Sequence, residues 1–300
     1  MPETLSSLIG SDAVQYDPAT AGSMYNKIKK VQIKPDNGPD ESNTTVAQFY
    51  GSGGHLAIVS KFVAGMECEI EGLPSSKIQS FGHFACKEDH SLRNQGMEYV
   101  SAPLERDALL NQFIELQKWL KLDPKKNPFS ERTSVHVHVN VSNMTMQQAK
   151  NMLMLYALYE ELFFSMVKPE RRANIHCVPL TETHLPGIYN KPMWLLRDRW
   201  SKYAAVNLMR MSDLGTIEFR HHHGSGDTEE ITAWLKVLDN LWTLARQVVI
   251  DEESLSNPAR VYAWFDAIFN PSPKTLMLGG QLHNIIQNSL IDVKFSVLKD

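Results

Sequence analysis

The chain of 300 residues is long enough for one large domain or two small ones with a sizeable core. Its hydrophobic fraction of 43% and charged fraction of 21% are those of a globular protein and exclude a largely disordered one. A formal net charge of -4 excludes the strongly basic overall surface that binds nucleic acid or anionic membranes.

Cysteine usage and apolar runs indicate the compartment. The three cysteines, Cys68, Cys86 and Cys177, form no CxxC pair, which argues against a disulfide framework. The first residues lack a basic stretch followed by an apolar run, and no apolar run is long enough to span a bilayer. We therefore expect a cytoplasmic protein with no membrane partner.

The first part of the chain changes character at about residue 45. Residues 1–45 are mixed and polar and end in a segment rich in proline, glycine and acidic residues, so we expect a polar N-terminal arm. The runs 46–51 and 55–63, separated by glycines, predict a hairpin-like pair of strands. Residues 66–71 and 97–103 predict two more strands, the second stopped by Pro103.

Helical and strand patterns alternate in the second part. Apolar spacing predicts helices from Arg106, from Met144 and from Glu229. Thr145, with Gln148 three residues later, predicts a capping box for the middle helix. Two alternating strands, SVHVHVN at 134–140 and GTIEFR at 215–220, lie between the helices. This order predicts an α+β fold with a largely antiparallel sheet and helices on one face.

The patterns also suggest a division of the chain. We expect residues 46–250 to form a catalytic domain, and residues 251–300 to form a C-terminal helical extension packed on it. That extension could cover a site or make a subunit contact.

Several of the predicted strands place polar side chains on one face. In 134–142, valines alternate with His136, His138 and Asn140, so the two sets face opposite sides of the strand. Each strand alone could equally be exposed to solvent, or its polar groups could bond one another. Because polar rows recur on several strands, we predict a site on the sheet face that carries no helices. The polar rows, taken together, are Glu67, Glu69, Glu71, Glu98, His136, His138, Asn140, Thr216, Glu218 and Arg220.

These side chains indicate metal and phosphate chemistry. Clustered carboxylates raise one another's pKa unless a cation neutralises them. Oxygen-rich ligand sets favour Mg²⁺ or Mn²⁺ over Zn²⁺, and Mn²⁺ tolerates an imidazole among them best. An arginine beside metals suits phosphate, because its planar fork pairs with phosphate oxygens. Together they indicate phosphoryl transfer from a nucleotide, held by the sheet face because the chain has no Walker or GxGxxG motif.

The order of the motifs adds a resemblance to a known family. GMECE is followed by DHS and GMEYVSAPL, then SVHVHVN, then KYAAVNL and GTIEFR, then HHHGSG and a tryptophan-bearing helix. Over residues 60–245 this order resembles the amidoligase family, within the glutamine synthetase and glutamate–cysteine ligase superfamily of carboxylate–amine ligases. The resemblance implies a curved sheet like that of the glutamine synthetase catalytic domain, ATP, and two or more divalent metals, Mg²⁺ or Mn²⁺.

The resemblance also implies roles for individual residues. The residues that match metal ligands of the family are Glu67, Glu69, Glu98, His136 and Glu218. The residues expected to contact the nucleotide are His138, Asn140, Lys202, Asn207, Arg210 and Arg220. Arg220, Glu218 and Glu67 are the expected catalytic residues, with Arg220 on a phosphate or acyl phosphate.

Some of these matches are imperfect. Lys202 and Tyr203 lie where the family has an Arg-Tyr pair, and lysine keeps the charge but loses the fork geometry. Arg210 fits a solvated hairpin as well as a phosphate contact. Asp89 and Ser91 match an Asp-x-Ser element that has no assigned role.

Residues next to these motifs leave further choices open. Alternation places His222 on the face of Arg220, where it would contact a ligand or solvent. Arg171 and Arg172 follow Pro169 and fit either a site for a substrate anion or a basic helix end. Glu71 is either a base for the amine proton or an exposed strand end.

The implied reaction is ATP-dependent amide formation through an acyl phosphate, by a carbon–nitrogen ligase. Its acid and amine could be small molecules or peptides, and a homo-oligomer is open because superfamily members often assemble. Two alternatives remain. His136, His138 and a glutamate could bind Zn²⁺ in a metal-dependent hydrolase, or the chain could be a non-catalytic relative that binds a ligand or partner.

Overall fold

The computed structural model describes residues 40–180, 188, 191–269 and 281–297. Residues 41–300 form one compact unit, which is described here by itself. Nearly all of the N-terminal arm expected at 1–45 lies outside the described residues. Among the described residues, no helix is long and apolar enough to cross a membrane.

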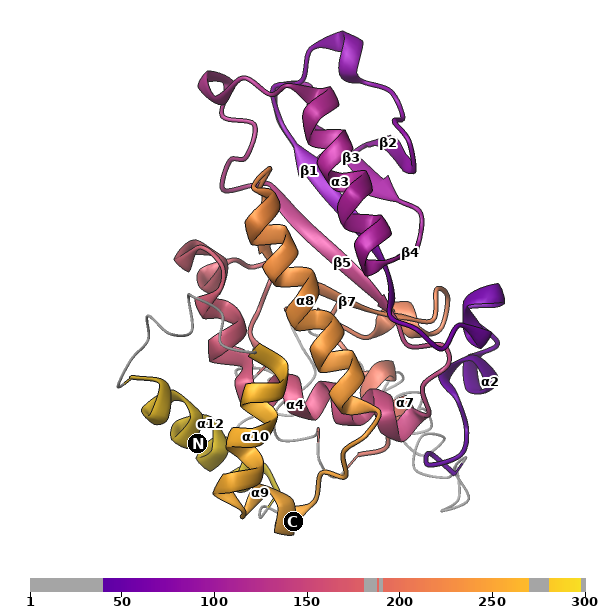
Figure 1. The fold of residues 1–300 in the computed structure, drawn as a ribbon, viewed down its shortest axis with the longest axis vertical. Coiled ribbons are helices and arrows are strands. Elements are labelled where there is room, and N and C mark those ends of the chain that lie inside the picture. The colour runs from indigo at the N-terminus through magenta and orange to yellow at the C-terminus, as the bar shows by residue number, and fades with distance from the viewer. Residues whose placement is uncertain (1–39, 181–187, 189–190, 270–280, 298–300) are drawn as a thin grey trace, which may run out of the picture. The chain divides into compact units, whose positions relative to one another are not determined.

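One antiparallel sheet organises this unit (Figure 1). The strands lie side by side in the order β2-β3-β1-β5-β7-β6, and β4 pairs with β1. The expected α+β fold class with an antiparallel sheet is confirmed. The strand bounds are β1 (Val63–Ile70), β2 (Phe84–Glu88), β3 (Met97–Ser101), β4 (Leu104–Glu105), β5 (Ser134–Asn140), β6 (Val206–Asn207) and β7 (Thr216–His223).

Three long helices pack against one face of the sheet. They are α3 (Arg106–Leu120), α4 (Met146–Ser165) and α8 (Thr228–Ala245), and in Figure 1 α3 and α8 cross in front of the strands. The apolar rows of β1 and β5, which include Met66 and Val137, join these helices in one buried core. This packing leaves the polar rows of the same strands on the other face.

Local capping chemistry explains where two of these helices begin. The Thr145 hydroxyl accepts from the Gln148 N–H at 3.1 Å, and the Gln148 side chain accepts from the Thr145 N–H at 3.0 Å. The predicted capping box of α4 is therefore confirmed. Helix α8 begins at Thr228, one residue earlier than predicted, because the Asp227 carboxylate caps the N–H groups of Glu229 and Glu230.

The hairpin expected at 46–51 and 55–63 is wrong. Residues Val46–Tyr50 form the short helix α2, and Gly54–Ile58 form a 3-10 turn. Thr45 and Gln48 make a second capping box, and Gly51 ends the helix at a φ of 71°. A run of five residues is too short for its apolar spacing to separate helix from strand, so this cap decided the outcome.

The C-terminal helices extend the helical side of the unit. The short α9 (Glu252–Leu255) precedes α10 (Pro258–Phe269), which packs against α8. Helix α12 (Gln281–Val297) packs against α4. Helix α7 (Met193–Asp198) also contacts α4. These contacts place the C-terminal helices against α4 and α8, and the polar face of the sheet stays uncovered by them.

Candidate active site

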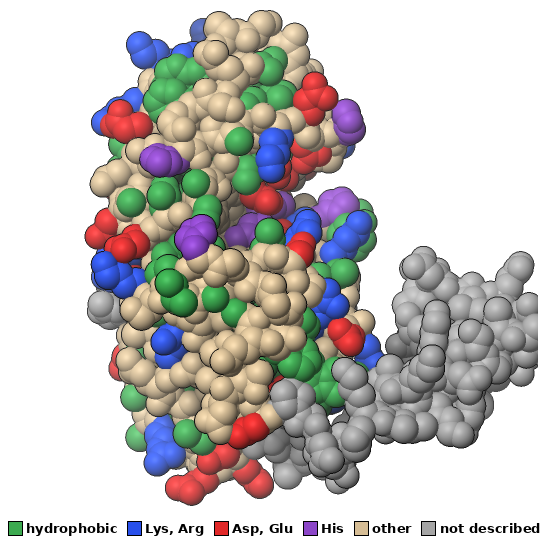
Figure 2. Space-filling view, turned by 90° about the vertical axis from the view of Figure 1, so that its right-hand side faces the viewer, with side chains coloured by type: hydrophobic (Ala, Val, Ile, Leu, Met, Phe, Trp, Pro, Cys, Tyr) green, Lys and Arg blue, Asp and Glu red, His purple; other side chains and the backbone are tan. Residues whose placement is uncertain are grey.

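Strand register brings the polar rows together across the sheet. On β1, Glu67 lies opposite His136 of β5 and Glu69 lies opposite Glu98 of β3. Further along β5, His138 lies opposite Glu218 of β7. Opposed residues point to the same side of the sheet, so the predicted metal ligands share one face. In Figure 2, histidine, acidic and basic side chains gather at a hollow at mid-height.

Glu67 is the centre of this face. Its two carboxylate oxygens lie 3.2 Å from His136 Nδ1 and 3.1 Å from His138 Nε2. Burial alone would raise the pKa of Glu67, but hydrogen bonds and charge from the two histidines outweigh burial and hold the pKa well below its usual range. The same contacts raise the pKa of His138 although burial opposes them. The contacts with the two imidazoles therefore favour the ionised form of Glu67.

Glu218 connects this centre to the cations. Asn207 donates to one of its oxygens at 2.7 Å, and the Arg220 guanidinium pairs with the other. That second oxygen also lies 3.7 Å from His136 Nδ1. Burial would raise the pKa of Glu218, but the charges of His136, Arg220 and His138 lower it. Glu218 is thus ionised and fully engaged, although only 2% of it is exposed.

A second group of carboxylates lies on the β1–β3 side. One oxygen of Glu69 accepts from the Ser134 N–H at 2.8 Å and from its hydroxyl at 2.7 Å. Glu98 lies beside it and is not neutralised in this way. Burial, and then the charges of Glu67, Glu69 and Asp89, raise the pKa of Glu98 to about 7. Repulsion of this kind is what a bound cation would relieve.

The donor atoms fit divalent metal ions. Within the described part of the chain, three groups of residues each offer ligand atoms within 4.8 Å of one another: Glu67, Glu98 and His136; Glu67, His138 and Glu218; and Glu69, Asp89 and Glu98. Each is rich in carboxylate oxygens and has at most one imidazole, a donor set that suits Mg²⁺ or Mn²⁺ better than Zn²⁺. All five predicted metal ligands occur in these groups.

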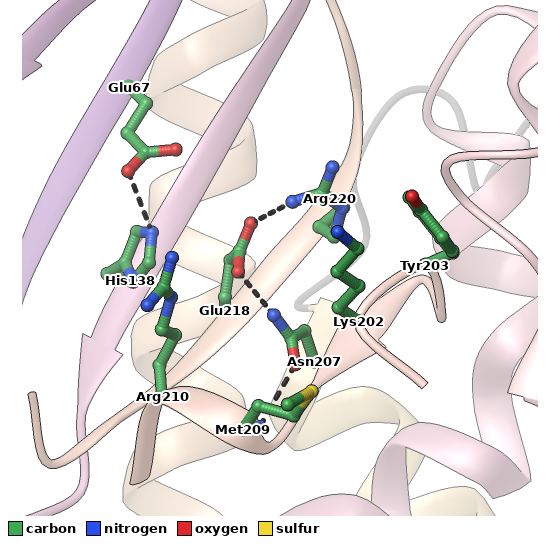
Figure 3. Close-up of a pocket in the computed structure, with 9 residues that line it drawn as sticks. All are labelled: Glu67, His138, Lys202, Tyr203, Asn207, Met209, Arg210, Glu218 and Arg220. Atoms are coloured by element: carbon green, nitrogen blue, oxygen red, sulfur yellow. Dashed lines mark hydrogen bonds and ion pairs between the residues drawn. The ribbon is translucent and has the colours of Figure 1, made fainter. Parts of the chain in front are cut away.

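A cationic cavity of about 340 Å³ adjoins the group formed by Glu67, His138 and Glu218 (Figure 3). In Figure 3, Glu67 and His138 lie on one side, and Glu218 and Asn207 lie between them and Lys202. Its cations are Lys202, Arg210 and Arg220. Lys202 lies over the Tyr203 ring at 4.9 Å, and Arg210 pairs with Asp213 at 2.9 Å. The cavity therefore gathers every predicted nucleotide-binding residue except Asn140.

Asn140 lies elsewhere on the same face. Its amide donates to the Leu56 carbonyl at 3.1 Å, and its oxygen accepts from the Ser142 N–H at 3.1 Å. These bonds hold the loops at the end of β5, and the residue lines a neighbouring cavity. Glu71 is 4% exposed and accepts from the Arg93 N–H at 2.7 Å, so it is not an exposed strand end.

A β-bulge corrects the expectation for His222. The β5–β7 register shifts between Val135 and Val137. Two residues of β7, Arg220 and His221, therefore lie opposite the single residue His136 of β5. As a result His222 lies opposite Val135, on the helix-covered face, and packs near Trp234. His222 therefore does not share the face of Arg220, because the extra residue reverses the alternation.

Arg171 supports this bulge and its role was missed from the sequence. Its guanidinium is buried and donates to the carbonyls of Arg220 and His221 at 2.6 and 2.9 Å. The Arg220 Nε in turn donates to the His176 carbonyl at 3.1 Å. The 169–178 segment therefore fixes the backbone and the side chain of Arg220. No local sequence signal distinguishes this from a basic helix end.

Two hydroxyl residues complete the polar rows. Ser134 contacts Glu69 and also lies 2.8 Å from His136 Nε2, and Thr216 lies 3.2 Å from His138 Nδ1. Partners on the second imidazole nitrogen fix the ring orientation and the tautomer. Thr216 was among the polar rows predicted from the sequence. Ser134 follows the same alternation on β5, so the pattern could have identified it too.

Comparison with known proteins identifies the family of the chain. The chain matches the model of a family described as putative amidoligase enzyme over residues 11–242, and it belongs to that family. It is also similar to a solved structure titled "Crystal structure of novel glutamine synthase homolog", with 11% identity and a TM-score of 0.36. That similarity covers 80% of this chain and 68% of the other. No curated protein matches the chain.

Proposed function

We propose that this protein is an ATP-dependent carboxylate–amine ligase that acts through an acyl phosphate. One observation carries the proposal: Glu218 belongs both to a group able to hold a metal and, through Arg220, to the cationic cavity. Metal ligands and phosphate-binding cations therefore meet at one residue, as phosphoryl transfer requires. Its acid and amine substrates are small molecules or peptides.

The cations of the cavity would hold the triphosphate. Arg220 offers a guanidinium fork whose backbone and Nε are both fixed, and Lys202 and Arg210 offer further charge. A divalent metal, when bound to the carboxylates, would neutralise phosphate charge and orient the acid substrate. The described site needs no protein nucleophile.

The bonds made and broken in the proposed reaction are as follows. An oxygen of the substrate carboxylate attacks the γ-phosphorus, and the bond from that phosphorus to the β-bridging oxygen breaks, so ADP leaves. The amine nitrogen then attacks the acyl carbon and expels phosphate, and the nitrogen loses a proton. Arg220 and the buried donors around Glu218 position these groups and stabilise charge without becoming covalently linked.

The grouping of the ligands disfavours a zinc hydrolase. A catalytic zinc commonly takes two or three histidine or cysteine ligands at one ion. Here each group contains at most one histidine, because His136 and His138 contact opposite oxygens of Glu67. Arg220 beside Glu218 also has no clear use in water activation.

The test is calorimetric titration with a non-hydrolysable ATP analogue, with and without Mg²⁺ or Mn²⁺. We expect binding that requires a metal and is lost in Glu218→Ala. The matched control is Glu115→Ala, which removes an exposed carboxylate of α3 that pairs with Lys118; it should bind as the wild type does. Absence of binding under either metal, or full binding by Glu218→Ala, would disprove the proposal.

A further inference from the structure

A second cavity lies on the other side of Glu67 and His138 from the Lys202–Arg220 end of the cationic cavity. It has a volume of about 400 Å³ and shares Glu67, His138 and Arg210 with the cationic cavity. Its remaining walls come mainly from β1, β3 and the loops around Leu56 and Leu214. Lys87 of β2, Asn140 of β5 and Thr216 of β7 also line it. The second cavity therefore adjoins the cationic cavity, but Lys202 and Arg220 do not line it.

Gly65 creates the space at the floor of this second cavity. It precedes Glu67 by two residues on β1 and lies opposite His138, so a side chain there would point into the site. A Cβ built on Gly65 would lie 3.8 Å from the Ser101 carbonyl oxygen and 4.0 Å from His138 Cβ, which is ordinary contact. The glycine is thus not required by backbone strain, and its missing side chain leaves room for a ligand.

The walls of the second cavity are mainly apolar. Leu56, Val63, Val100, Pro103 and Leu214 contribute to them. Such surfaces bind apolar groups. The polar side chains between them, which include Ser101, Asn140 and Thr216, would set the orientation of a ligand.

The two cations of this cavity are each near a carboxylate. Arg210 pairs with Asp213 at 2.9 Å, and in the proposed function its remaining donors hold the triphosphate in the cationic cavity. Lys87 lies opposite Glu98 in the β2–β3 register. Among the described lining residues, no further Lys or Arg is present to bind a second anionic group.

We propose that the second cavity binds the acid substrate, and that this substrate carries one carboxylate on an apolar body the size of an acylated amino acid. The inference rests on the proposed ligase function. In phosphoryl transfer the attacking and leaving oxygens are in line, so the acid must approach from the side opposite to ADP. With the triphosphate on Lys202 and Arg220, that side is the second cavity. Its volume falls in the range of small-molecule sites.

The probes are N-acetyl-L-leucine and N-acetyl-L-glutamate, which differ in the charge of the side chain. Binding is measured by calorimetry to full-length protein saturated with Mg²⁺ and the ATP analogue. We expect N-acetyl-L-leucine to bind at least ~10-fold more tightly, because the glutamate carboxylate would lose water without gaining a cation. A third probe, hexylamine, tests whether the cavity prefers an apolar amine.

Variants at Gly65 and Leu214 locate the binding. Gly65→Ala should reduce affinity for N-acetyl-L-leucine slightly and Gly65→Leu at least ~10-fold, since the larger side chain fills the cavity. Leu214→Asp should also weaken it. Ile58→Asp changes a neighbouring apolar residue that is 88% exposed and outside the cavity, and should have no effect. All four variants should bind the metal–ATP analogue as the wild type does.

The outcomes separate this inference from the function on which it rests. If the wild type fails to bind the metal–ATP analogue, the ligase proposal fails. If the analogue binds but N-acetyl-L-leucine does not, only the inference is wrong. The same holds if N-acetyl-L-glutamate or hexylamine binds as tightly as N-acetyl-L-leucine does. Unchanged N-acetyl-L-leucine affinity in Gly65→Leu would likewise overturn it.

Discussion

At the scale of single residues, the site balances an excess of negative charge. Glu67 and Glu218 have partners that stabilise their charge. Glu98 is partly buried and lies near other carboxylates, and both effects disfavour its charged form. Without a metal, the charge of Glu98 opposes folding, because the unfolded chain separates these groups. If Glu98 binds a metal as proposed, the same charge would favour the folded state by contributing to binding.

Glu98→Gln should therefore have opposite effects with and without a metal. In the presence of a chelator the variant should be more stable by about 1 kcal/mol, because it removes repulsion at nearly constant shape. In Mg²⁺ or Mn²⁺ the gain in melting temperature that the wild type shows should shrink or vanish. Thermal unfolding measured in chelator and in each metal checks both signs. A variant less stable than the wild type in chelator would show that Glu98 is not repelled by its neighbours.

At the scale of elements, the bulge in β7 determines what each side of that strand does. Before the bulge, Glu218 and Arg220 face the site, and after it His222 faces the helices. The extra residue leaves carbonyl groups outside the ladder, and buried carbonyls need partners. Arg171 supplies those hydrogen bonds from a different segment.

Arg171→Met should be destabilising and should also weaken the site. Loss of two hydrogen bonds to buried carbonyls is expected to lower the free energy of unfolding by about 2–4 kcal/mol. Because the bulge positions Arg220, affinity for the metal–ATP analogue should fall at a temperature where the variant is still folded. Urea unfolding and calorimetry measure the two effects.

Arg172→Met is the control for Arg171→Met. Arg172 is partly exposed and pairs with Glu161 at 2.6 Å, so its loss should cost less than about 1 kcal/mol and leave binding unchanged. Equal effects of the two substitutions would contradict a specific role for Arg171.

At the scale of the whole described unit, stability and chemistry are divided between the two faces of the sheet. The core lies between the sheet and α3, α4 and α8, and the C-terminal helices pack onto α4 and α8. The opposite face carries the carboxylates, imidazoles and cations of the site. Substitutions far out on the helical side should therefore change stability without changing the site.

Ile286→Ala tests this division. Ile286 of α12 is fully buried, and its truncation should lower the free energy of unfolding by about 2–4 kcal/mol. Affinity for the metal–ATP analogue, measured well below the melting temperature, should stay within about twofold of the wild type. Asn288→Ala, at an exposed position of the same helix, should change neither quantity. Loss of binding in folded Ile286→Ala would show that the helical layer and the site are coupled.

The sequence alone determined which side chains could share a face. Alternation along β1, β5 and β7 assigned Glu67, His136, His138 and Glu218 to polar rows, because successive residues of a strand point to opposite sides. The capping box of α4 was likewise readable, since its partners are three residues apart. Such features depend only on local geometry.

Only the tertiary structure decided how these rows meet and what surrounds them. The register that sets Glu67 against His136, the bulge that turns His222 inward and the reach of Arg171 to β7 all join segments far apart in the chain. The space left by Gly65 exists only because β3 and β5 flank it. Pairing between distant strands depends on the packing of the whole sheet, which no local pattern encodes.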